Sequence, residues 1–351
     1  MSAVNIEKPL IYDLDLDQLK ELVQSWGEPA YRAKQIWQGI YLQLYRTAQD
    51  FTTLPANLRE KMTEKLRFTG IEPAAILKSS DAQTVKTLFH LDDRRAIEAV
   101  LMRYEHRQTL CISSQAGCAM GCSFCATGQM GFKRHLTSGE IVEQVLYYAR
   151  VLKEEGKVVT NIVVMGMGEP FHNYDNTLAA IDRLNHPEGF NLGARRFTIS
   201  TVGLVPMIRR FASEKRQINL AISLHASDDE LRSSMMPVDK KYPIAELIQA
   251  CKEYIDATGR RLTFEWALIQ GVNDTPEQAQ ALARLLKGML CHVNVIPLNP
   301  TQKFSGTGST RQRALAFQAE LEKAGIPCTI RIRRGIDIQA GCGQLATEYA
   351  A

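Results

Sequence analysis

Three cysteines stand in one short segment of the chain. Cys118, Cys122 and Cys125 form a CxxxCxxC spacing, which offers three thiolates from a single loop. A structural zinc ion needs four protein ligands, whereas a [4Fe-4S] cluster bound by three thiolates keeps one iron open for a small molecule. Neighbouring glycines would let the backbone wrap closely around such a cluster. The spacing therefore favours iron and sulfur, and the alternative is a zinc site with Cys111 as its fourth ligand.

A glycine-rich turn is the second candidate for chemistry. In the segment MGMGEP, residues 165–170, two glycines permit close approach to the backbone, and Glu169 offers a carboxylate to the ammonium group of a ligand. The alternative is an ordinary turn between a strand and a helix, in which Gly166 and Gly168 serve only the backbone geometry.

Apolar runs that alternate with helical stretches would bring these loops together. The runs cover residues 110–113, 162–165, 197–200, 220–224, 262–268 and 293–298. Because helical stretches separate them, the pattern predicts a βα unit repeated about six times. Parallel strands of this kind close into a full or partial barrel, whose active site lies at the carboxyl ends of the strands. The candidate loops follow those ends directly.

Two smaller regions precede the predicted barrel. Residues 14–66 show the apolar periodicity of three short amphipathic helices, and residues 82–114 alternate with period two, which predicts a β meander. We therefore expect an α/β fold, a partial (βα)6 barrel with a small helical N-terminal domain. The expected parts are a helical domain over 1–75, a meander linker over 76–108 and the barrel with its C-terminal loop over 109–345.

Composition sets weaker limits. The 351 residues carry a formal charge of +4 and are 45% hydrophobic, which allows a sizeable core and allows nucleic-acid binding without arguing for it. No apolar run approaches the roughly 18 residues of a membrane span, and the N-terminal region lacks the features of a signal peptide. We expect a cytoplasmic monomer with no membrane association.

Motifs spread over most of the chain resemble those of one family. They are CISSQ (111–115), GFKRHLT (131–137), MGMGEP (165–170), SLHA (223–226), PLNP (297–300) and GIDIQAGCGQ (335–344). With the cysteine loop they resemble the RlmN/Cfr family of radical S-adenosylmethionine (SAM) enzymes, and in detail the branch that methylates C2 of an adenine in 23S ribosomal RNA (rRNA). The resemblance implies a [4Fe-4S] cluster and SAM as cofactors and a radical SAM barrel as the fold.

The resemblance also assigns binding roles to single residues. Cys118, Cys122 and Cys125 would bind the cluster, and the SAM-binding residues would be Gly168, Glu169, Ser200, Ser223, Leu224, His225 and Asn299. By sequence alone, Ser200 could merely cap a helix, and a lone histidine such as His225 is more often structural than a ligand. Their common place at the strand ends favours the functional interpretation.

Three catalytic roles come from the resemblance alone. Cys342 would carry the methyl group, with Cys111 as its resolving partner. Without the resemblance, Cys342 could be an ordinary loop thiol between two glycines. Glu98 would accept a proton from the substrate, although its place on a predicted meander strand favours a solvent-exposed carboxylate. Small core side chains are expected for the remaining cysteines, Cys251, Cys291 and Cys328.

The implied mechanism follows from the target atom. Adenine C2 lies between two ring nitrogens and is electron-poor, so it does not take the methyl group of SAM by simple displacement. The Cys342 thiolate would take methyl from one SAM, and a second SAM, cleaved to a 5'-deoxyadenosyl radical, would remove hydrogen from that methyl group. After addition to C2, attack by Cys111 would release the RNA and leave a disulfide. Turnover then needs an external electron donor and a disulfide reductant.

Basic residues give diffuse support for 23S rRNA as the partner. The clusters at 133–135 and 331–334 bracket the predicted site and are the expected phosphate contacts. The resemblance adds the helical N-terminal domain as a second RNA-binding surface. Because the family also modifies transfer RNA (tRNA) beside the anticodon, tRNA stays open as a second substrate. Two other functions stay open: methylation of C8, as in the sister branch, and RNA binding without catalysis by a protein with structural zinc.

Overall fold

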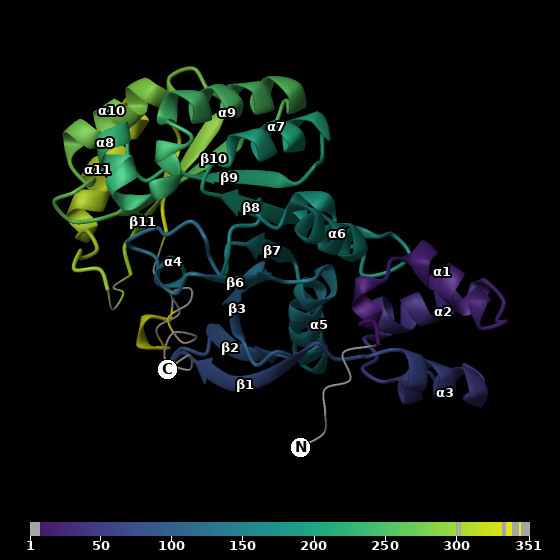
Figure 1. Cartoon of the computed structure of the whole chain (residues 1–351). Coiled ribbons are helices and arrows are strands. Elements are labelled where there is room, and N and C mark those ends of the chain that lie inside the picture. Colours follow the sequence, from purple (N-terminus) through teal and green to yellow (C-terminus); the bar gives the residue numbers. More distant parts are fainter. Residues whose placement is uncertain (1–7, 300, 302, 332–334, 339–343, 345–351) are drawn as a thin grey trace.

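The computed structural model describes residues 8–299, 301, 303–331, 335–338 and 344. Its N-terminal part consists of three helices, α1 (Leu16–Ser25), α2 (Tyr31–Gln38) and α3 (Ala56–Lys65), which agrees with the predicted helical region. Asp15 starts α1 through a capping box with Gln18. Figure 1 shows these helices together at one side of the molecule.

The N-terminal helices share one hydrophobic core with the rest of the chain. One contiguous cluster of buried side chains extends from Leu10 to Cys328, and a second, smaller cluster lies beside the cysteine loop. Arg183 also donates to the backbone carbonyls of Asp13 and Leu14, and Arg150 donates to the carbonyl of Leu44 at 2.9 Å. The helical region is therefore packed firmly on the main body.

The main body is a curved ten-stranded sheet with an antiparallel and a parallel half. Its strand order is β1-β2-β3-β4-β7-β8-β9-β10-β11-β12. The antiparallel half contains β1 (Ile71–Lys78), β2 (Thr84–Leu91), β3 (Ala96–Tyr104) and β4 (Arg107–Cys111). The parallel half contains β7 (Asn161–Val164), β8 (Phe197–Thr201), β9 (Asn219–Ser223), β10 (Leu262–Leu268), β11 (Cys291–Pro297) and β12 (Cys328–Ile330). In the described residues β12 does not pair with β1, so the barrel is partial.

Helices follow the strands and cover the outside of the sheet (Figure 1). The longer ones are α5 (Ser138–Glu154), α6 (Tyr174–Asn185), α7 (Val205–Ser213), α8 (Asp229–Met235), α9 (Ile244–Thr258), α10 (Pro276–Leu286) and α11 (Arg311–Lys323). Short 3₁₀ or π turns occupy Ile11–Asp13, Gly39–Gln43, Ala48–Asp50, Ala194–Arg196, Pro237–Lys240 and Ile336–Ile338. None of the described helices is long and apolar enough to cross a membrane.

The meander belongs to the same sheet as the barrel. β4 pairs antiparallel with β3 on one side and parallel with β7 on the other. The meander also begins earlier than its alternating pattern suggests, because Ile71 already pairs with Leu91 across the first hairpin. The expected boundary after residue 75 therefore falls inside β1, and the three-part division stays a prediction.

A small hairpin holds the cysteine loop. Its strands β5 (Gln115–Gly117) and β6 (Phe132–His135) bracket the loop and the short helix α4 (Ala126–Gln129). Gly117 has a φ of +73°, and a side chain there would collide with the carbonyl of Gly131, to which the N–H of Cys118 donates at 3.1 Å. Only glycine satisfies both demands at this position.

Candidate active site

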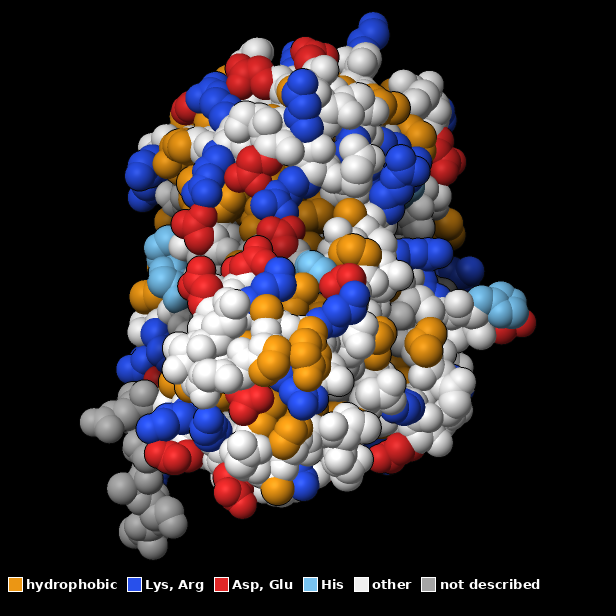
Figure 2. Space-filling model, turned by 90° about the vertical axis from the view of Figure 1, so that its right-hand side faces the viewer, with side chains coloured by type: hydrophobic (Ala, Val, Ile, Leu, Met, Phe, Trp, Pro, Cys, Tyr) orange, Lys and Arg blue, Asp and Glu red, His pale blue; other side chains and the backbone are white. Residues whose placement is uncertain are grey.

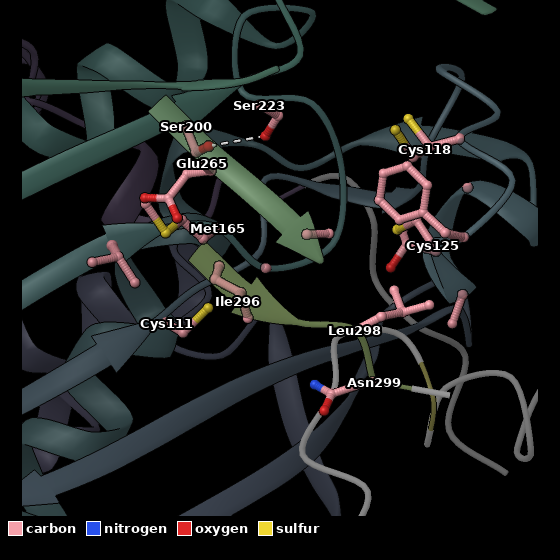
Figure 3. Close-up of a pocket in the computed structure, with 18 of the residues that line it drawn as sticks. Cys111, Cys118, Cys125, Met165, Ser200, Ser223, Glu265, Ile296, Leu298 and Asn299 are labelled. Carbon is pink, nitrogen blue, oxygen red and sulfur yellow. Dashed lines mark hydrogen bonds between the residues drawn. The ribbon is translucent and has the colours of Figure 1, made fainter. Parts of the chain in front are cut away.

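A cavity of about 440 Å³ lies at the carboxyl ends of the parallel strands. Figure 3 shows Cys118 and Cys125 on one side of it, and Cys111, Ser200 and Glu265 on the other. Predicted site residues elsewhere on its wall are Cys122, Gly168, Glu169, Ser223, His225 and Asn299. The fold thus brings to one cavity residues that are far apart in the sequence.

The three loop thiols are largely withdrawn from water. Cys118 and Cys122 are 8% and 7% exposed, and Cys125 is half-buried. Burial raises the pKa of Cys118 to about 12 and raises the pKa of Cys122 well above its ordinary value, to which the other two thiols contribute. Such buried groups are neutral thiols near neutral pH and become thiolates when a metal centre displaces their protons.

The surroundings of these thiols fit a cluster with one open iron. A structural zinc ion requires four protein ligands, whereas an iron-sulfur cluster holds each thiolate on a separate iron and keeps one iron open when three thiolates bind it. Cys111 lies across the cavity from Cys118 (Figure 3), which removes the fourth ligand of the zinc alternative.

Glu169 is held rigidly at the end of β7. Its carboxylate accepts the amide hydrogens of Phe171 at 3.0 Å and Val202 at 2.9 Å, while its own N–H donates to Gln115 Oε1. Burial raises the pKa of Glu169 to about 7. A ligand ammonium group beside it would favour the charged form, as expected for a carboxylate that binds an amine.

The two glycines before Glu169 serve the packing of the protein itself. A Cβ at Gly166 would lie 2.5 Å from the carbonyl oxygen of Ile112, and one at Gly168, with a φ of +103°, would lie 2.5 Å from Cβ of Gln115. The close approach that they permit therefore joins the end of β7 to the segment after β4. Contact between Gly168 and SAM stays a prediction.

Two serines meet at the ends of β8 and β9. The hydroxyl groups of Ser200 and Ser223 lie 3.4 Å apart on the cavity wall. Ser200 is not a helix cap, since α7 begins after Leu204. Asn299 lines the cavity just beyond β11, whereas Leu224 is fully buried and lies outside the described cavity lining.

His225 is neutral and fixed in orientation. Its Nδ1 accepts the N–H of Ala267 at 2.9 Å, which places the ring hydrogen on Nε2. Burial lowers its pKa to about 3. The ring stands edge-on to Phe124 of the cysteine loop, with ring centroids 5.1 Å apart. His225 thus supports the loop, and its assignment to SAM stays a prediction.

Cys111 lies on the cavity wall opposite the cysteine loop. Burial raises its pKa to about 11, and the nearby Arg331 acts against that rise. Cys342 lies outside the described residues. The described residues Arg331 and Gln344, which precede and follow that part of the chain, both line the cavity.

Glu98 is buried, which corrects the expectation of a solvent-exposed strand carboxylate. It is 2% exposed and pairs with Lys86 at 2.7 Å. Tyr148 of α5 covers one face of β3 by donating to the Ala99 carbonyl, while Val100, on the face of Glu98, lines the cavity. Both faces of this strand are therefore enclosed, because the barrel closes over the face that alternation alone leaves to solvent. Glu98 itself is not among the described lining residues.

Ion pairs occupy much of the predicted basic surface. Arg134 pairs with Asp93 at 2.6 Å and with Glu140 at 2.7 Å, so the 133–135 cluster is partly internal. Figure 2, which views the side with the N-terminal helices, shows Lys and Arg interspersed with Asp and Glu. In the 331–334 cluster the structure describes Arg331 alone, and this residue lines the cavity. RNA contacts at these clusters stay predictions.

Two buried charged residues escaped the sequence analysis. Lys86 alternates with apolar residues on β2, and its pairing with Glu98 depends on a strand register that the sequence does not state. Glu265 interrupts an apolar run on a strand that is buried on both faces, which is a usable signal for function. Neither position belongs to one of the motifs that carry the family resemblance.

Comparisons with known proteins agree with this geometry. Residues 112–286 match the model of the radical SAM superfamily, and residues 10–67 match that of the ribosomal RNA large subunit methyltransferase N-terminal domain. The crystal structure of a radical SAM methyltransferase from Sphaerobacter thermophilus is 50% identical, with a TM-score of 0.93 and coverage of 95% of this chain and 98% of that chain. The chain is therefore a radical SAM enzyme.

Full-length relatives identify the family of this chain within the radical SAM superfamily. A probable dual-specificity RNA methyltransferase RlmN of Chloroflexus aurantiacus is 49% identical, over 98% of this chain and 94% of the relative. The dual-specificity RNA methyltransferase RlmN 1 of Myxococcus xanthus is 48% identical, over 95% and 93%. The chain belongs to the RlmN family, which confirms the predicted family and fold.

Proposed function

We propose that the chain methylates C2 of an adenine in 23S rRNA. The observation that carries adenine methylation is the position of Cys111, which lies across one cavity from the cysteine loop, and the RlmN names of the full-length relatives favour C2 over C8. A general radical SAM site needs the loop but not a thiol on the opposite wall. The names of the full-length relatives support RNA as the substrate, and their dual specificity supports tRNA as a second substrate.

The cysteine loop and the strand ends have separate binding roles. Cys118, Cys122 and Cys125 hold the [4Fe-4S] cluster, which when bound supplies the electron that cleaves SAM. Glu169 receives the ammonium group of SAM, and its amide contacts with Phe171 and Val202 fix the carboxylate in place. Ser200, Ser223, His225 and Asn299 surround the remainder of SAM from the ends of successive strands.

The thiols and Glu98 perform the transfer to RNA. Cys342 accepts the methyl group and forms the covalent link to adenine C2. Glu98 takes the C2 proton, with Lys86 at 2.7 Å stabilising the carboxylate before transfer. The Cys111 thiolate then attacks the sulfur of Cys342 and breaks the bond from that sulfur to the transferred carbon. That carbon takes up a proton and leaves with the RNA as a methyl group, the surplus electron returns to the cluster, and a disulfide remains. An external thiol reductant restores both thiols, and an external donor supplies the electron.

Transfer of a labelled methyl group tests this proposal. Protein reconstituted with iron and sulfide under anaerobic conditions is mixed with methyl-labelled SAM, a reductant and a 23S rRNA fragment. Label should enter the RNA, and it should be lost when the reductant is omitted or when Cys118→Ala replaces the wild type. Absence of label in RNA from a protein that contains a complete cluster and cleaves SAM would overturn the proposal.

A further inference from the structure

One carboxylate in the cavity has no role in the proposed function. Glu265 stands on β10, is 4% exposed and lines the cavity wall. Its Oε1 accepts a hydrogen bond from Asn294 at 3.0 Å. Its Oε2 is buried and makes no hydrogen bond with any described residue. The guanidinium of Arg331 comes within 3.8 Å of that oxygen, which is too long for a hydrogen bond.

The Glu265 oxygen that lacks a hydrogen bond calls for a donor other than the described residues. A buried carboxylate oxygen without a hydrogen bond is costly, because water no longer solvates it. Burial raises the pKa of Glu265, while Arg331 and the contact with Asn294 oppose this rise. The Arg331 guanidinium at 3.8 Å favours the ionised form of Glu265, and an ionised carboxylate only accepts hydrogen bonds, so the missing partner is a group that donates.

The neighbours of Glu265 indicate which donor fits. Ser223, Glu265 and Asn294 are register partners on three adjacent parallel strands, so they stand at one level of the wall. The Ser200 and Ser223 hydroxyls, 3.4 Å apart, adjoin this row (Figure 3). Hydroxyl side chains beside a carboxylate suit a sugar edge, because an acidic side chain readily accepts from ribose hydroxyl groups.

We infer that Glu265 accepts a hydrogen bond from a ribose hydroxyl of SAM and so positions the nucleoside in the cavity. This inference rests on the proposed function. It places the ribose at the Ser200 and Ser223 side, and the amino-acid end at Glu169 near the cysteine loop. The main competing donor is the amino group of the RNA adenine, which the experiment separates from the ribose.

Binding of S-adenosylhomocysteine and its deoxyribose analogues tests the inference. This probe keeps the ribose and amino-acid ends of SAM and has no methyl group to transfer. Dissociation constants are measured by calorimetry on the reconstituted full chain for the parent compound and for its 2'-deoxy and 3'-deoxy forms. Glu265→Gln keeps an oxygen for Asn294 and removes the acceptor toward the cavity. Glu322→Gln, an exposed change on α11, controls for the lost charge.

The expected result is specific for one hydroxyl group. Glu265→Gln should weaken binding of the parent compound by about ten- to a hundredfold, as for a lost hydrogen bond to a charged group. One deoxy analogue should bind the wild type equally weakly, and Glu265→Gln should not weaken it further. Glu322→Gln should bind all three compounds as the wild type does. Iron content and thermal unfolding of Glu265→Gln should match the wild type. If this variant does not fold, equal binding of the parent compound and both deoxy analogues by the wild type would overturn the inference.

Each of four outcomes would overturn the inference. Parent binding within about twofold of the wild type would show that Glu265 contributes no such bond. Equal weakening of the parent and both deoxy analogues would place the contact elsewhere on SAM. Weaker RNA binding with unchanged S-adenosylhomocysteine binding would assign Glu265 to the RNA adenine. If the wild type itself binds no S-adenosylhomocysteine, the proposed use of SAM fails as well, and that failure is visible before any variant is made.

Discussion

The two halves of the sheet build opposite parts of the same cavity and differ in their relation to the superfamily. The parallel strands β7 to β10 and the cysteine loop fall within residues 112–286, which match the superfamily model. The antiparallel strands β1 to β4 precede that match, and Cys111 is the last residue of β4. The general half suits the cluster and SAM, and the added half brings Cys111 and Glu98, to which the proposed function gives roles in methyl transfer.

The halves also differ in how their buried charges are partnered. In the antiparallel half, Lys86 and Glu98 neutralise each other at 2.7 Å with both side chains at or below 1% exposure. In the parallel half, Glu265 keeps an oxygen without a hydrogen bond among the described residues. The Lys86 and Glu98 pair suits a permanent part of the site, because each side chain already has its partner. The Glu265 oxygen without a hydrogen bond suits the binding of a ligand that is released after each turnover. Changes in the two halves should therefore separate SAM cleavage from methyl transfer.

The largest expected effect comes from the cysteine loop. Replacing Cys118, Cys122 or Cys125 by Ala removes one of three cluster ligands and should abolish bound iron, SAM cleavage and RNA methylation together. Iron analysis and detection of 5'-deoxyadenosine measure the loss. Cys251→Ala is the matched control, because this thiol is fully buried in the core away from the cavity. Near-stoichiometric iron in a variant with all three cysteines replaced would refute the cluster assignment.

Cys111→Ala, a change in the antiparallel half, should block release of the RNA without affecting SAM cleavage. The cluster and SAM cleavage should persist, while the link between Cys342 and RNA should form without being resolved. A denaturing gel should show a slow-moving protein band that ribonuclease removes, and peptide mass analysis should place the modification on Cys342.

Cys342→Ala provides the contrast, since it removes the methyl carrier and should give neither adduct nor product. If the two cysteine variants behave alike, with no adduct in either, the sequential use of the two thiols is wrong.

The Lys86 and Glu98 pair should govern stability in the antiparallel half. Lys86→Met leaves a buried carboxylate without its cation and should lower the free energy of unfolding by about 3 to 5 kcal/mol. Lys86→Met with Glu98→Gln should recover most of that loss, because no uncompensated charge remains. Urea unfolding of the reconstituted protein measures both. A double variant no more stable than Lys86→Met would contradict the pairing.

A smaller, graded effect should appear in the pH dependence of RNA release. Burial raises the pKa of Cys111 to about 11, so its reactive thiolate is scarce near neutral pH. Below that pKa the thiolate fraction, and with it the release rate, should rise about tenfold for each pH unit. Arg331→Met should slow release at a given pH, since the guanidinium favours the thiolate. A pH-jump single-turnover assay measures the rate of RNA release. A release rate that does not change with pH would show that Cys111 is not the attacking group.

Local spacing explains what the sequence predicted well. The cysteine loop, the Glu169 turn and the alternating apolar runs each depend on a few neighbouring residues, so the partial barrel and the shared cavity follow from them. The π turn after α2 and the early start of β1 have weaker local signals. Ile71 joins the sheet through its pairing with Leu91, which lies on another strand.

Long-range packing explains what the sequence missed. Alternation correctly put Glu98 and Ala99 on opposite faces of β3, but it does not state what covers each face. The Lys86 partner lies diagonally across from Glu98, since Leu88 is the direct register partner. The proposed role of Glu265 depends on neighbours from four adjacent strands. Ser200, Ser223 and Asn294 approach it only in the folded sheet.

The position of the new methyl group on adenine tests the central claim most directly. RNA from the complete reaction is digested to nucleosides, and the methylated adenosine is examined by mass spectrometry and nuclear magnetic resonance. We predict a methyl group at C2, with loss of the C2 proton signal and retention of the C8 proton signal. A methyl group at C8 with the C2 proton retained would contradict this account and place the chain with the sister branch.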